Sequence, residues 1–278
     1  MASAAPCTSF GAVPQYPQAM EPAPLATTRA TVTRLPGGAI EADRLAAEEP
    51  LEIRVNGRAI AVTMRTPGHD EELALGFCLT EGLRPVSARP ADDLAVNIVE
   101  VDAPGADLER VQRSFYTSSS CGVCGKGALE AISVEAPRIE SDLSVPFVVV
   151  TSLPVMLREA QAAFELTGGL HATGLFSADG TLDCLREDVG RHNAMDKVIG
   201  WALGQGRVPL DQCVLCVSGR LSFELVQKAA VAGCPVLVAV GAPSSLAVEL
   251  ADDRGLTLCG FVRDGRATVY THAERIAA

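Results

Sequence analysis

Strand and helix patterns alternate over residues 170–271, and this alternation constrains the fold more than any other feature of the sequence. Apolar runs predict strands at 170–176, 182–185, 213–217 and 236–240, with two more that start at 256 and 266. Asp179-Gly180 and Asp264-Gly265 are typical of hairpin turns. Helices are expected at 191–203, 223–232 and 244–252. Alternation of this kind predicts a sheet with helices on its faces, and we assign this α/β domain to residues 128–278.

Residues 29–116 predict a smaller α+β unit. Asn56-Gly57 joins strand patterns at 51–55 and 59–64, which is a strong hairpin signal. A helix at 70–81 is acidic in its first turn and is followed by Gly82, and another strand is expected at 94–101. Residues 1–28, rich in Ala, Pro, Ser and Thr, predict a disordered tail. Further on, 147–150 fit either a strand or the approach to a helix, and Pro154 predicts a helix through 166 that ends at Gly168-Gly169.

Residues 117–127 separate the two units and hold Cys121 and Cys124, each followed by glycine, with Lys126 close behind. Three interpretations are open. A structural zinc site would need two more ligands, and no second well-spaced Cys/His pair stands out. A thioredoxin-like redox site would have few glycines. A sulfur-carrying nucleophile needs mobility and exposure, which the glycines favour, and a lysine near the sulfur would favour the thiolate.

The other cysteines have a simpler explanation. Cys213 and Cys216 also form a CxxC pattern, but residues three apart in a strand point to opposite faces, so both are expected to be core thiols. The remaining cysteines in apolar contexts are expected to pack inside the protein: Cys78, Cys184, Cys234 and Cys259. Cys7 lies in the predicted tail. Residues 1–28 show no secretory signal, so the expected location is the cytoplasm, with reduced thiols.

Net charge and hydropathy exclude two classes of partner. The formal net charge of -11 argues against a general nucleic-acid binder. No apolar run approaches the roughly 18 residues that a membrane span requires, so no membrane partner is expected. Neither observation excludes a local pocket for a small anion.

Polar residues gather where predicted strands give way to helices. The first group follows the strand near 185 and comprises Arg191, His192, Asn193, Asp196 and Lys197. The second group follows the strand 213–217 and comprises Ser218, Gly219, Arg220 and Ser222. Gly241-Ala242-Pro243 follows the next strand. Loops at the carboxyl ends of strands converge on one crevice in open α/β sheets, which predicts a nucleotide-sized pocket. Asn193 or Asp196 could pair with a guanine edge, so guanine nucleotides should bind better than adenine nucleotides. The simpler alternative is a solvated helix start with mixed ion pairs.

His171-Ala172-Thr173 invites comparison with zinc deaminases, which carry His-x-Glu followed by Pro-Cys-x-x-Cys. Thr173 replaces the glutamate, and the glycine-rich CxxC precedes the histidine. Deaminase chemistry is therefore not expected even if the fold is shared, and no metal site is predicted.

Five motifs in order resemble the FdhD family, the formate dehydrogenase accessory sulfurtransferases, over about residues 30–272: Cys121-Gly122-Val123-Cys124-Gly125, Thr167-Gly168-Gly169-Leu170-His171, Glu187-Asp188-Val189-Gly190-Arg191-His192-Asn193, Ser218-Gly219-Arg220 and Gly260-Phe261-Val262-Arg263. The resemblance implies a homodimer with a cytidine-deaminase-like α/β domain. It also implies that sulfur from a cysteine desulfurase is carried as a cysteine persulfide to the molybdenum bis-guanine-dinucleotide cofactor, before the cofactor enters formate dehydrogenase.

By match to the motif, Cys121 takes the persulfide role and Cys124 assists. The segment that matches the family's cofactor-binding segment comprises Phe261, Val262, Arg263, Asp264, Gly265 and Arg266. GDP-like nucleotides should then mimic the bound cofactor. The alternative from another class is a guanine-nucleotide-binding regulatory module whose cysteines bind metal.

Overall fold

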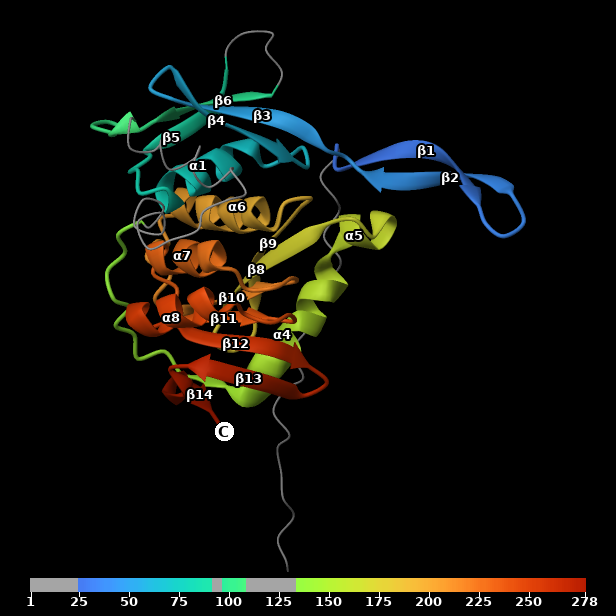
Figure 1. The fold of residues 1–278 in the computed structure, drawn as a ribbon. Coiled ribbons are helices and arrows are strands. Elements are labelled where there is room, and N and C mark those ends of the chain that lie inside the picture. The colour runs from blue at the N-terminus through green and yellow to red at the C-terminus, as the bar shows by residue number, and fades with distance from the viewer. Residues whose placement is uncertain (1–24, 92–96, 109–133) are drawn as a thin grey trace, which may run out of the picture.

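A six-stranded mixed sheet forms the centre of the protein in the computed structural model, which describes residues 25–91, 97–108 and 134–278 (Figure 1). The strand order is β13-β12-β11-β10-β8-β9. The strands are β8 (His171–Ser177), β9 (Leu182–Asp188), β10 (Cys213–Val217), β11 (Val236–Ala239), β12 (Thr257–Arg263) and β13 (Arg266–Thr271). Strands β10, β11 and β12 pair in parallel, and β8 is antiparallel to both β9 and β10. The carboxyl ends of β9, β10, β11 and β12 therefore lie at one edge of the sheet.

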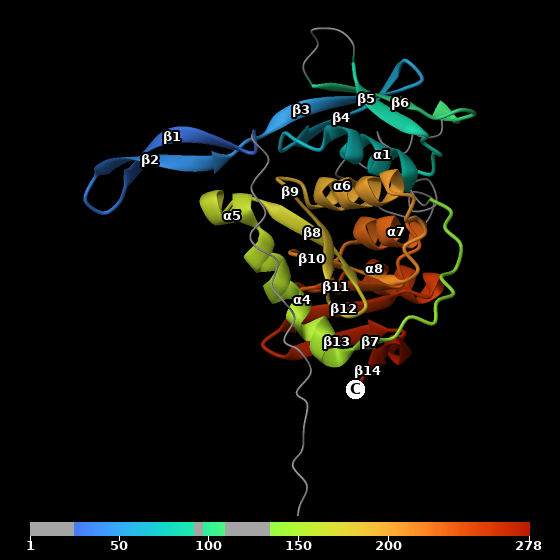
Figure 2. The same ribbon diagram turned by 180° about the vertical axis from the view of Figure 1, so that it is seen from behind.

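Helices cover both faces of this sheet, which confirms the predicted α/β class (Figures 1 and 2). One face packs against α6 (Arg191–Gly204), α7 (Phe223–Val231) and α8 (Ser245–Arg254), and the other packs against α4 (Phe147–Ala160). Cys213 belongs to the core on the α6 side and Cys216 to the core on the α4 side. The prediction that this CxxC points to opposite faces is therefore confirmed.

The helix predicted to start at Pro154 and run through 166 starts too late and misses a break in the middle, whereas its predicted end at Gly168-Gly169 is confirmed. Helix α4 starts at Phe147, holds the buried Pro154 in its interior, and ends at Ala160; a short helix α5 (Ala162–Thr167) follows. A proline within a helix removes one backbone hydrogen bond, and burial of α4 against the sheet outweighs that loss here. Gln161, with φ -79° and ψ 78°, separates the two helices. Glu187 accepts hydrogen bonds from the backbone N–H groups of Ala163 and Phe164 and so begins α5 as a new helix.

The N-terminal unit is a four-stranded sheet packed on one helix. Its order is β4-β3-β6-β5, with β3 (Glu49–Val55), β4 (Arg58–Arg65), β5 (Ser87–Pro90), β6 (Ile98–Asp102) and helix α1 (Asp70–Thr80). The hairpin at Asn56-Gly57 is confirmed, with positive φ at both turn residues. The strand predicted at 94–101 starts later, at Ile98, and residues 92–96 lie outside the described residues.

A two-stranded hairpin projects from the body (Figure 1) and was not predicted: β1 (Thr27–Arg34) pairs with β2 (Ala39–Ala46). The predicted tail therefore extends too far by two residues, and residues 1–24 lie outside the described part. Near the C-terminus, β7 (Val145–Pro146) pairs with β14 (Ile276–Ala277) after a 3-10 turn (Ala273–Arg275).

The two units meet where α1 crosses α6, and glycines allow their backbones to touch. A Cβ atom added at Gly76 would lie 1.8 Å from the carbonyl oxygen of Asp196, and one added at Gly200 would lie 1.8 Å from that of Glu72. Arg186 at the end of β9 also makes an ion pair with Glu72 of α1, 2.6 Å from Nε to Oε2. This close crossing fixes α1 on top of α6 and hence fixes the start of α6 relative to the sheet.

Candidate functional site

The loop after β10, the loop after β11 and strand β12 are hydrogen-bonded to one another in series at the carboxyl edge of the sheet. Gly241 N–H donates to the carbonyl of Gly219 at 3.2 Å, and Phe261 N–H donates to the carbonyl of Gly241 at 3.1 Å. A Cβ atom at Gly241 would lie 2.8 Å from that same Gly219 oxygen, so this approach requires glycine. Two of the three predicted strand-end loops, those after β10 and β11, are thus brought together.

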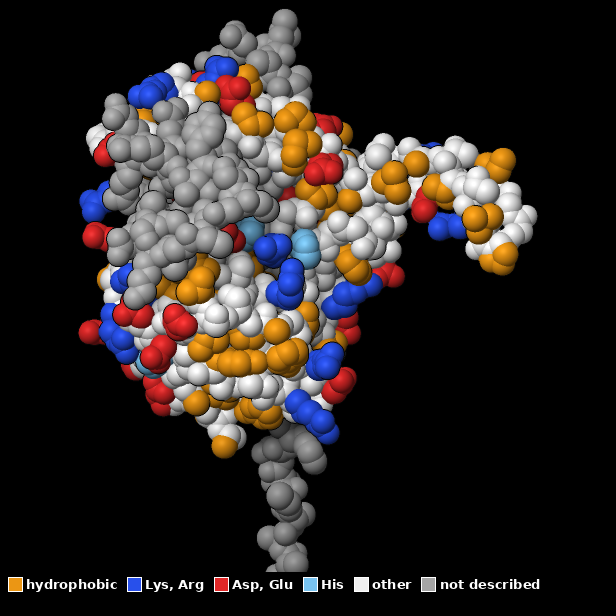
Figure 3. Space-filling model, in the orientation of Figure 1, with side chains coloured by type: hydrophobic (Ala, Val, Ile, Leu, Met, Phe, Trp, Pro, Cys, Tyr) orange, Lys and Arg blue, Asp and Glu red, His pale blue; other side chains and the backbone are white. Residues whose placement is uncertain are grey.

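The start of β8 and the start of α6 complete this edge. His171 is the first residue of β8, and its Nδ1 would lie 3.6 Å from a Cβ atom added at Gly219. Ser218 Oγ accepts a hydrogen bond from Ala172 N–H at 2.9 Å. Figure 3 shows Lys/Arg and His side chains gathered at the middle of this face, where Figure 1 shows the ends of β8 and β10. The edge is therefore a local site of positive charge on an acidic protein.

Two buried polar atoms at this edge have no partner within the described residues. They are Thr173 Oγ1 and Arg191 Nε. Thr173 lies on the same face of β8 as His171, because strand side chains alternate. Burial lowers the pKa of His171, and the charges of Arg191 and His192 lower it further. Unsatisfied buried groups beside a cationic helix start are suited to an anionic or carbonyl-bearing ligand.

His192 is held by a carboxylate at the start of α7. Its Nε2 lies 2.9 Å from Glu224 Oε2 and 3.4 Å from Ser222 Oγ. The hydrogen bond from His192 lowers the pKa of Glu224, against the opposing effect of burial. The predicted residues His192 and Ser222 thus contact each other, whereas Glu224 was not predicted as part of this site.

Asp196 and Lys197 are buried and do not face the carboxyl edge of the sheet, which corrects the prediction made for them. Lys228 Nζ lies 2.8 Å from Asp196 Oδ2, and Thr80 Oγ1 donates to Asp196 Oδ1 at 2.9 Å. Lys197 Nζ lies 2.8 Å from Asp188 Oδ2, and both of these side chains are almost fully buried. Residues 196 and 197 lie in the second turn of α6 and face the protein interior, where a charged side chain needs a partner of opposite charge.

Asn193 also has internal partners. Its Nδ2 donates to the carbonyl of Met64 at 2.8 Å and to Asp188 Oδ1 at 3.1 Å. These bonds tie the start of α6 to β4, so the guanine-reading role predicted for Asn193 or Asp196 has no support in the geometry. The sequence did hold one signal for the burial of Asp196. Lys228 lies inside the apolar run around 225–232, and a lysine buried there requires an acidic partner.

The segment matched to cofactor binding forms the tip of the β12–β13 hairpin. Phe261 is 43% exposed and has φ 52°, while Asp264 and Gly265 also have positive φ and make the turn. The arginines of this segment, Arg263 and Arg266, are exposed, as is Arg220 on the loop after β10. Val262 is fully buried in the core on the α4 side, so only its backbone can face a ligand.

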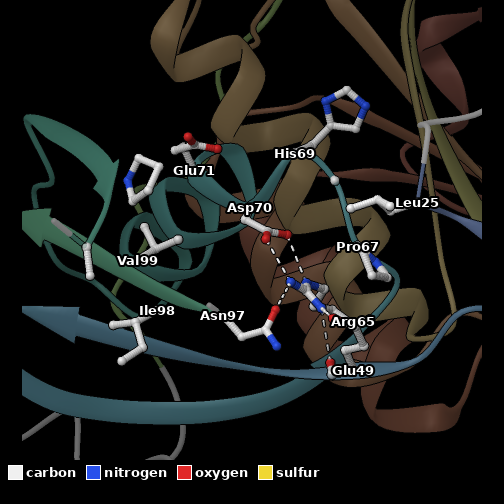
Figure 4. Close-up of a pocket in the computed structure, with 13 residues that line it drawn as sticks. Leu25, Glu49, Arg65, Pro67, His69, Asp70, Glu71, Asn97, Ile98 and Val99 are labelled. Atoms are coloured by element: carbon white, nitrogen blue, oxygen red, sulfur yellow. Dashed lines mark hydrogen bonds and ion pairs between the residues drawn. The ribbon is translucent and has the colours of Figure 1, made fainter. Parts of the chain in front are cut away.

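A cavity of about 520 Å³ lies elsewhere, between α1 and the N-terminal sheet (Figure 4). Its central cation, Arg65, binds Asp70 through Nε at 2.9 Å and Nη2 at 2.8 Å, and Asn97 Oδ1 through Nη2 at 2.7 Å. Glu49 takes the remaining nitrogen, Nη1, at 3.4 Å. Because every nitrogen of Arg65 already has a partner, this cluster holds the N-terminal unit together and offers no cation to a ligand.

The described cysteines are poor nucleophiles. All six are buried, free thiols. Burial raises the pKa of Cys78, Cys184, Cys234 and Cys259 to about 12, and it also raises the pKa of Cys213 and Cys216. A thiol reacts as thiolate, so none of these is suited to sulfur transfer near neutral pH. Cys121 and Cys124 lie outside the described residues.

The fold and this edge define a mixed α/β protein with cationic side chains at the carboxyl edge of its central sheet. The FdhD/NarQ family matches residues 46–277, and the chain belongs to this family. It is 52% identical over 271 residues to the sulfur carrier protein FdhD of Mycolicibacterium paratuberculosis, covering 90% of this chain and 98% of that protein. The sulfur carrier protein FdhD of Sulfolobus acidocaldarius is 44% identical over 237 residues, covering 84% of this chain and 91% of that protein.

A solved structure agrees with the fold. The crystal structure of a putative formate dehydrogenase accessory protein from Desulfotalea psychrophila matches with a TM-score of 0.70 and 29% identity, over 90% of this chain and 98% of that one. Across residues 25–91, 97–108 and 134–278, no helix has both the length and the apolar character needed to cross a membrane.

Proposed function

We propose that the protein is a sulfur carrier for the maturation of formate dehydrogenase, with Cys121 as the residue that carries sulfur. The observation that carries this proposal is the burial of the other thiols. The sequence has nine cysteines, and the six in the described part are buried with raised pKa values. Only Cys7, Cys121 and Cys124 remain as acceptors, and the relatives named above are called sulfur carrier proteins.

The transfer needs no outside oxidant. The Cys121 thiolate attacks the outer sulfur of a persulfide on a cysteine desulfurase, a new S–S bond forms, and the donor cysteine leaves as a thiolate. The Cys124 thiolate can then attack the inner sulfur of the Cys121 persulfide, which forms a Cys121–Cys124 disulfide and releases the outer sulfur to the acceptor as hydrosulfide. A cellular thiol reductant then reduces the disulfide and restores both thiols. We assign this reaction to the reducing cytoplasm, where free thiols persist.

The acceptor in this proposal is the molybdenum bis-guanine-dinucleotide cofactor, bound as a substrate at the carboxyl edge. Arg191, Arg220 and Arg263 supply cations suited to its phosphates, since a guanidinium binds phosphate through a planar pair of N–H groups. Arg191 Nε is buried and has no hydrogen-bond partner among the described residues, which supports a ligand at the carboxyl edge. We further propose that formate dehydrogenase receives the sulfurated cofactor and that the carrier acts as a homodimer.

Formate dehydrogenase activity in a host that lacks its own carrier tests the proposal. Cys121→Ala should abolish the activity, while Cys216→Ala serves as the matched control because that thiol is buried in the core. The control should cost about 1 kcal/mol of stability and leave activity in place. Normal activity with Cys121→Ala would refute the assignment.

Nucleotide binding tests the arginine edge separately. Arg220→Ala should weaken GDP binding about ten- to a hundred-fold, because it removes a charge-assisted contact. Arg29→Ala, an exposed arginine on the projecting hairpin, is the control and should bind as the parent does. Equal affinity of Arg220→Ala and the parent would remove Arg220 from the site.

A further inference from the structure

His192, at the start of α6, is held through one of its ring nitrogens by side chains from the start of α7. Its Nε2 lies 2.9 Å from Glu224 Oε2 and 3.4 Å from Ser222 Oγ. A carboxylate accepts hydrogen bonds and donates none, so Nε2 carries the hydrogen and the lone pair of the neutral ring lies on Nδ1. Nδ1 has no partner within the described residues, and the side chain is 33% exposed. The contact with Glu224 thus leaves one nitrogen of His192 able to take up and release a proton.

Ser222 makes this contact in place of an ordinary structural role. It is the N-cap residue of α7, where a serine hydroxyl usually accepts a backbone N–H of the first turn, but it accepts none from α7, whose residues are all described. Ser244, at the same position of α8, does cap its helix by accepting from Ala247 N–H. The Ser222 hydroxyl lies 3.4 Å from both His192 Nε2 and Glu224 Oε2 instead. The loop after β10 therefore positions the imidazole rather than capping α7.

This arrangement is suited to proton exchange and not to a serine nucleophile. In a Ser-His-acid triad the serine and the carboxylate contact opposite nitrogens of the ring, whereas Ser222 and Glu224 share Nε2. His171 is the other imidazole at this edge, and burial lowers its pKa, as do the charges of Arg191 and His192. Neighbouring titratable groups in different environments take different roles in proton transfer. Of the two rings, His192 is the one with a carboxylate placed to stabilise a protonated imidazole.

We propose that His192 Nδ1 moves a proton from sulfur to oxygen when hydrosulfide is transferred to the acceptor metal at the carboxyl edge, with Glu224 as the residue that positions the ring. The inference rests on the proposed function, in which sulfur leaves Cys121 as hydrosulfide and the cofactor binds at this edge. Nδ1 takes the proton of the hydrosulfide as the sulfur binds the metal, and returns it to a hydroxide ligand of the metal, which leaves as water. One S–H and one metal–oxygen bond break, one metal–sulfur and one O–H bond form, and no oxidation state changes.

Sulfur transfer by the full chain tests the inference. A cysteine desulfurase loads Cys121 with radiolabelled sulfur, the molybdenum bis-guanine-dinucleotide cofactor is added at saturation so that weaker binding does not contribute, and the label on the cofactor is followed with time. His192→Ala should load Cys121 as the parent does but transfer sulfur about 10²–10⁴-fold more slowly, the usual contribution of a general acid–base residue. Added imidazole should restore part of this rate, and more basic substituted imidazoles should restore more. A purely structural role of His192 would not produce that order.

Two further variants separate the roles of the contact. Glu224→Gln should slow transfer less than His192→Ala, and imidazole should not restore its rate, because the His192 ring still occupies its place. His272→Ala is the matched control, since His272 also contacts a carboxylate, with Nδ1 3.1 Å from Glu274 Oε1, but lies near the C-terminus. It should transfer sulfur at the parent rate with or without imidazole.

The inference is overturned by transfer at the parent rate in His192→Ala, or by a slow rate that no imidazole restores. If His192→Ala does not fold, as judged by circular dichroism, His192→Gln replaces the ring by a side chain that cannot exchange a proton, and transfer at the parent rate in that variant also overturns the inference. Loading of Cys121 distinguishes this failure from that of the proposed function. Normal loading and transfer that do not depend on His192 remove the proton role only. A parent that does not load Cys121, or that loads it and passes no sulfur to the cofactor, removes the proposed function and this inference together.

Discussion

Replacing Lys228 with methionine should destabilise the protein by about 3–5 kcal/mol, because the change leaves a buried carboxylate without its cation. Lys228 Nζ lies 2.9 Å from Asp196 Oδ1 and 2.8 Å from Oδ2, and Asp196 is 2% exposed. A second carboxylate, Glu81, has an oxygen 4.0 Å from the same nitrogen. Burial raises the pKa of Glu81, and the charge of Lys228 partly offsets that rise. Without the lysine, two carboxylates face each other across the α1–α6–α7 contact.

The assay is thermal and urea unfolding of the parent and three variants. A loss of this size should lower Tm by roughly 6–20 °C, at about 2–4 °C per kcal/mol for a chain near this length. The double variant Lys228→Met/Asp196→Leu should recover most of the loss, since replacing both members of a buried pair by apolar groups is often neutral. Arg34→Met, which breaks an exposed pair with Asp43, should cost less than about 1 kcal/mol.

The reasoning is refuted if Lys228→Met is as stable as the parent. That result would mean that Asp196 does not depend on Lys228 inside the protein, and the ligand role predicted for Asp196 from the sequence would be open again.

Three further predictions follow from particular contacts. At pH 7.5 a maleimide should label the native protein only at the cysteines outside the described part, which are Cys7, Cys121 and Cys124. The six buried cysteines should be labelled only after unfolding, as read by peptide mass spectrometry. Rapid labelling of any of these six in the native protein would contradict the burial that we assign. Gly200→Ala should destabilise by about 1–3 kcal/mol or more, because its Cβ would meet the carbonyl of Glu72, whereas Gly204→Ala on the same helix has open space and should be neutral or slightly stabilising; equal unfolding curves for the two would contradict the close helix crossing. The His192 hydrogen bond lowers the pKa of Glu224, so its contribution to stability is present above the unfolded pKa of about 4.3 and is lost as the pH falls through the lower folded value. Glu224→Gln should therefore reduce Tm more at pH 7 than in acid, and an equal reduction at every pH would exclude this linkage.

Local chemistry made much of the fold predictable. The turns Asn56-Gly57 and Asp264-Gly265 need positive φ, and their residue types tolerate it, so both hairpins lie where the sequence places them. The alternation in β10 likewise placed Cys213 and Cys216 in opposite cores. Glycine-bearing loops after successive strands also indicated the shared edge, because parallel strands end on the same side of a sheet.

Partners distant in the chain account for what could not be predicted. Asp196 accepts from Lys228, 32 residues away, and from Thr80, 116 residues away, and no local pattern identifies such partners. The helix break at Gln161 depends on Glu187, 24 residues beyond Ala163, which caps the second helix. The projecting hairpin was missed because its residues are mostly exposed on both faces, so the apolar alternation of a half-buried strand is absent.

Mass spectrometry of the protein after incubation with a cysteine desulfurase and cysteine tests the central claim most directly. A gain of about 32 Da, one sulfur atom, should appear on the peptide that contains Cys121. The gain should be absent in Cys121→Ala and unchanged in Cys216→Ala. Added sulfur on Cys216 or another buried cysteine, or no added sulfur on any thiol of a folded protein, would contradict the account.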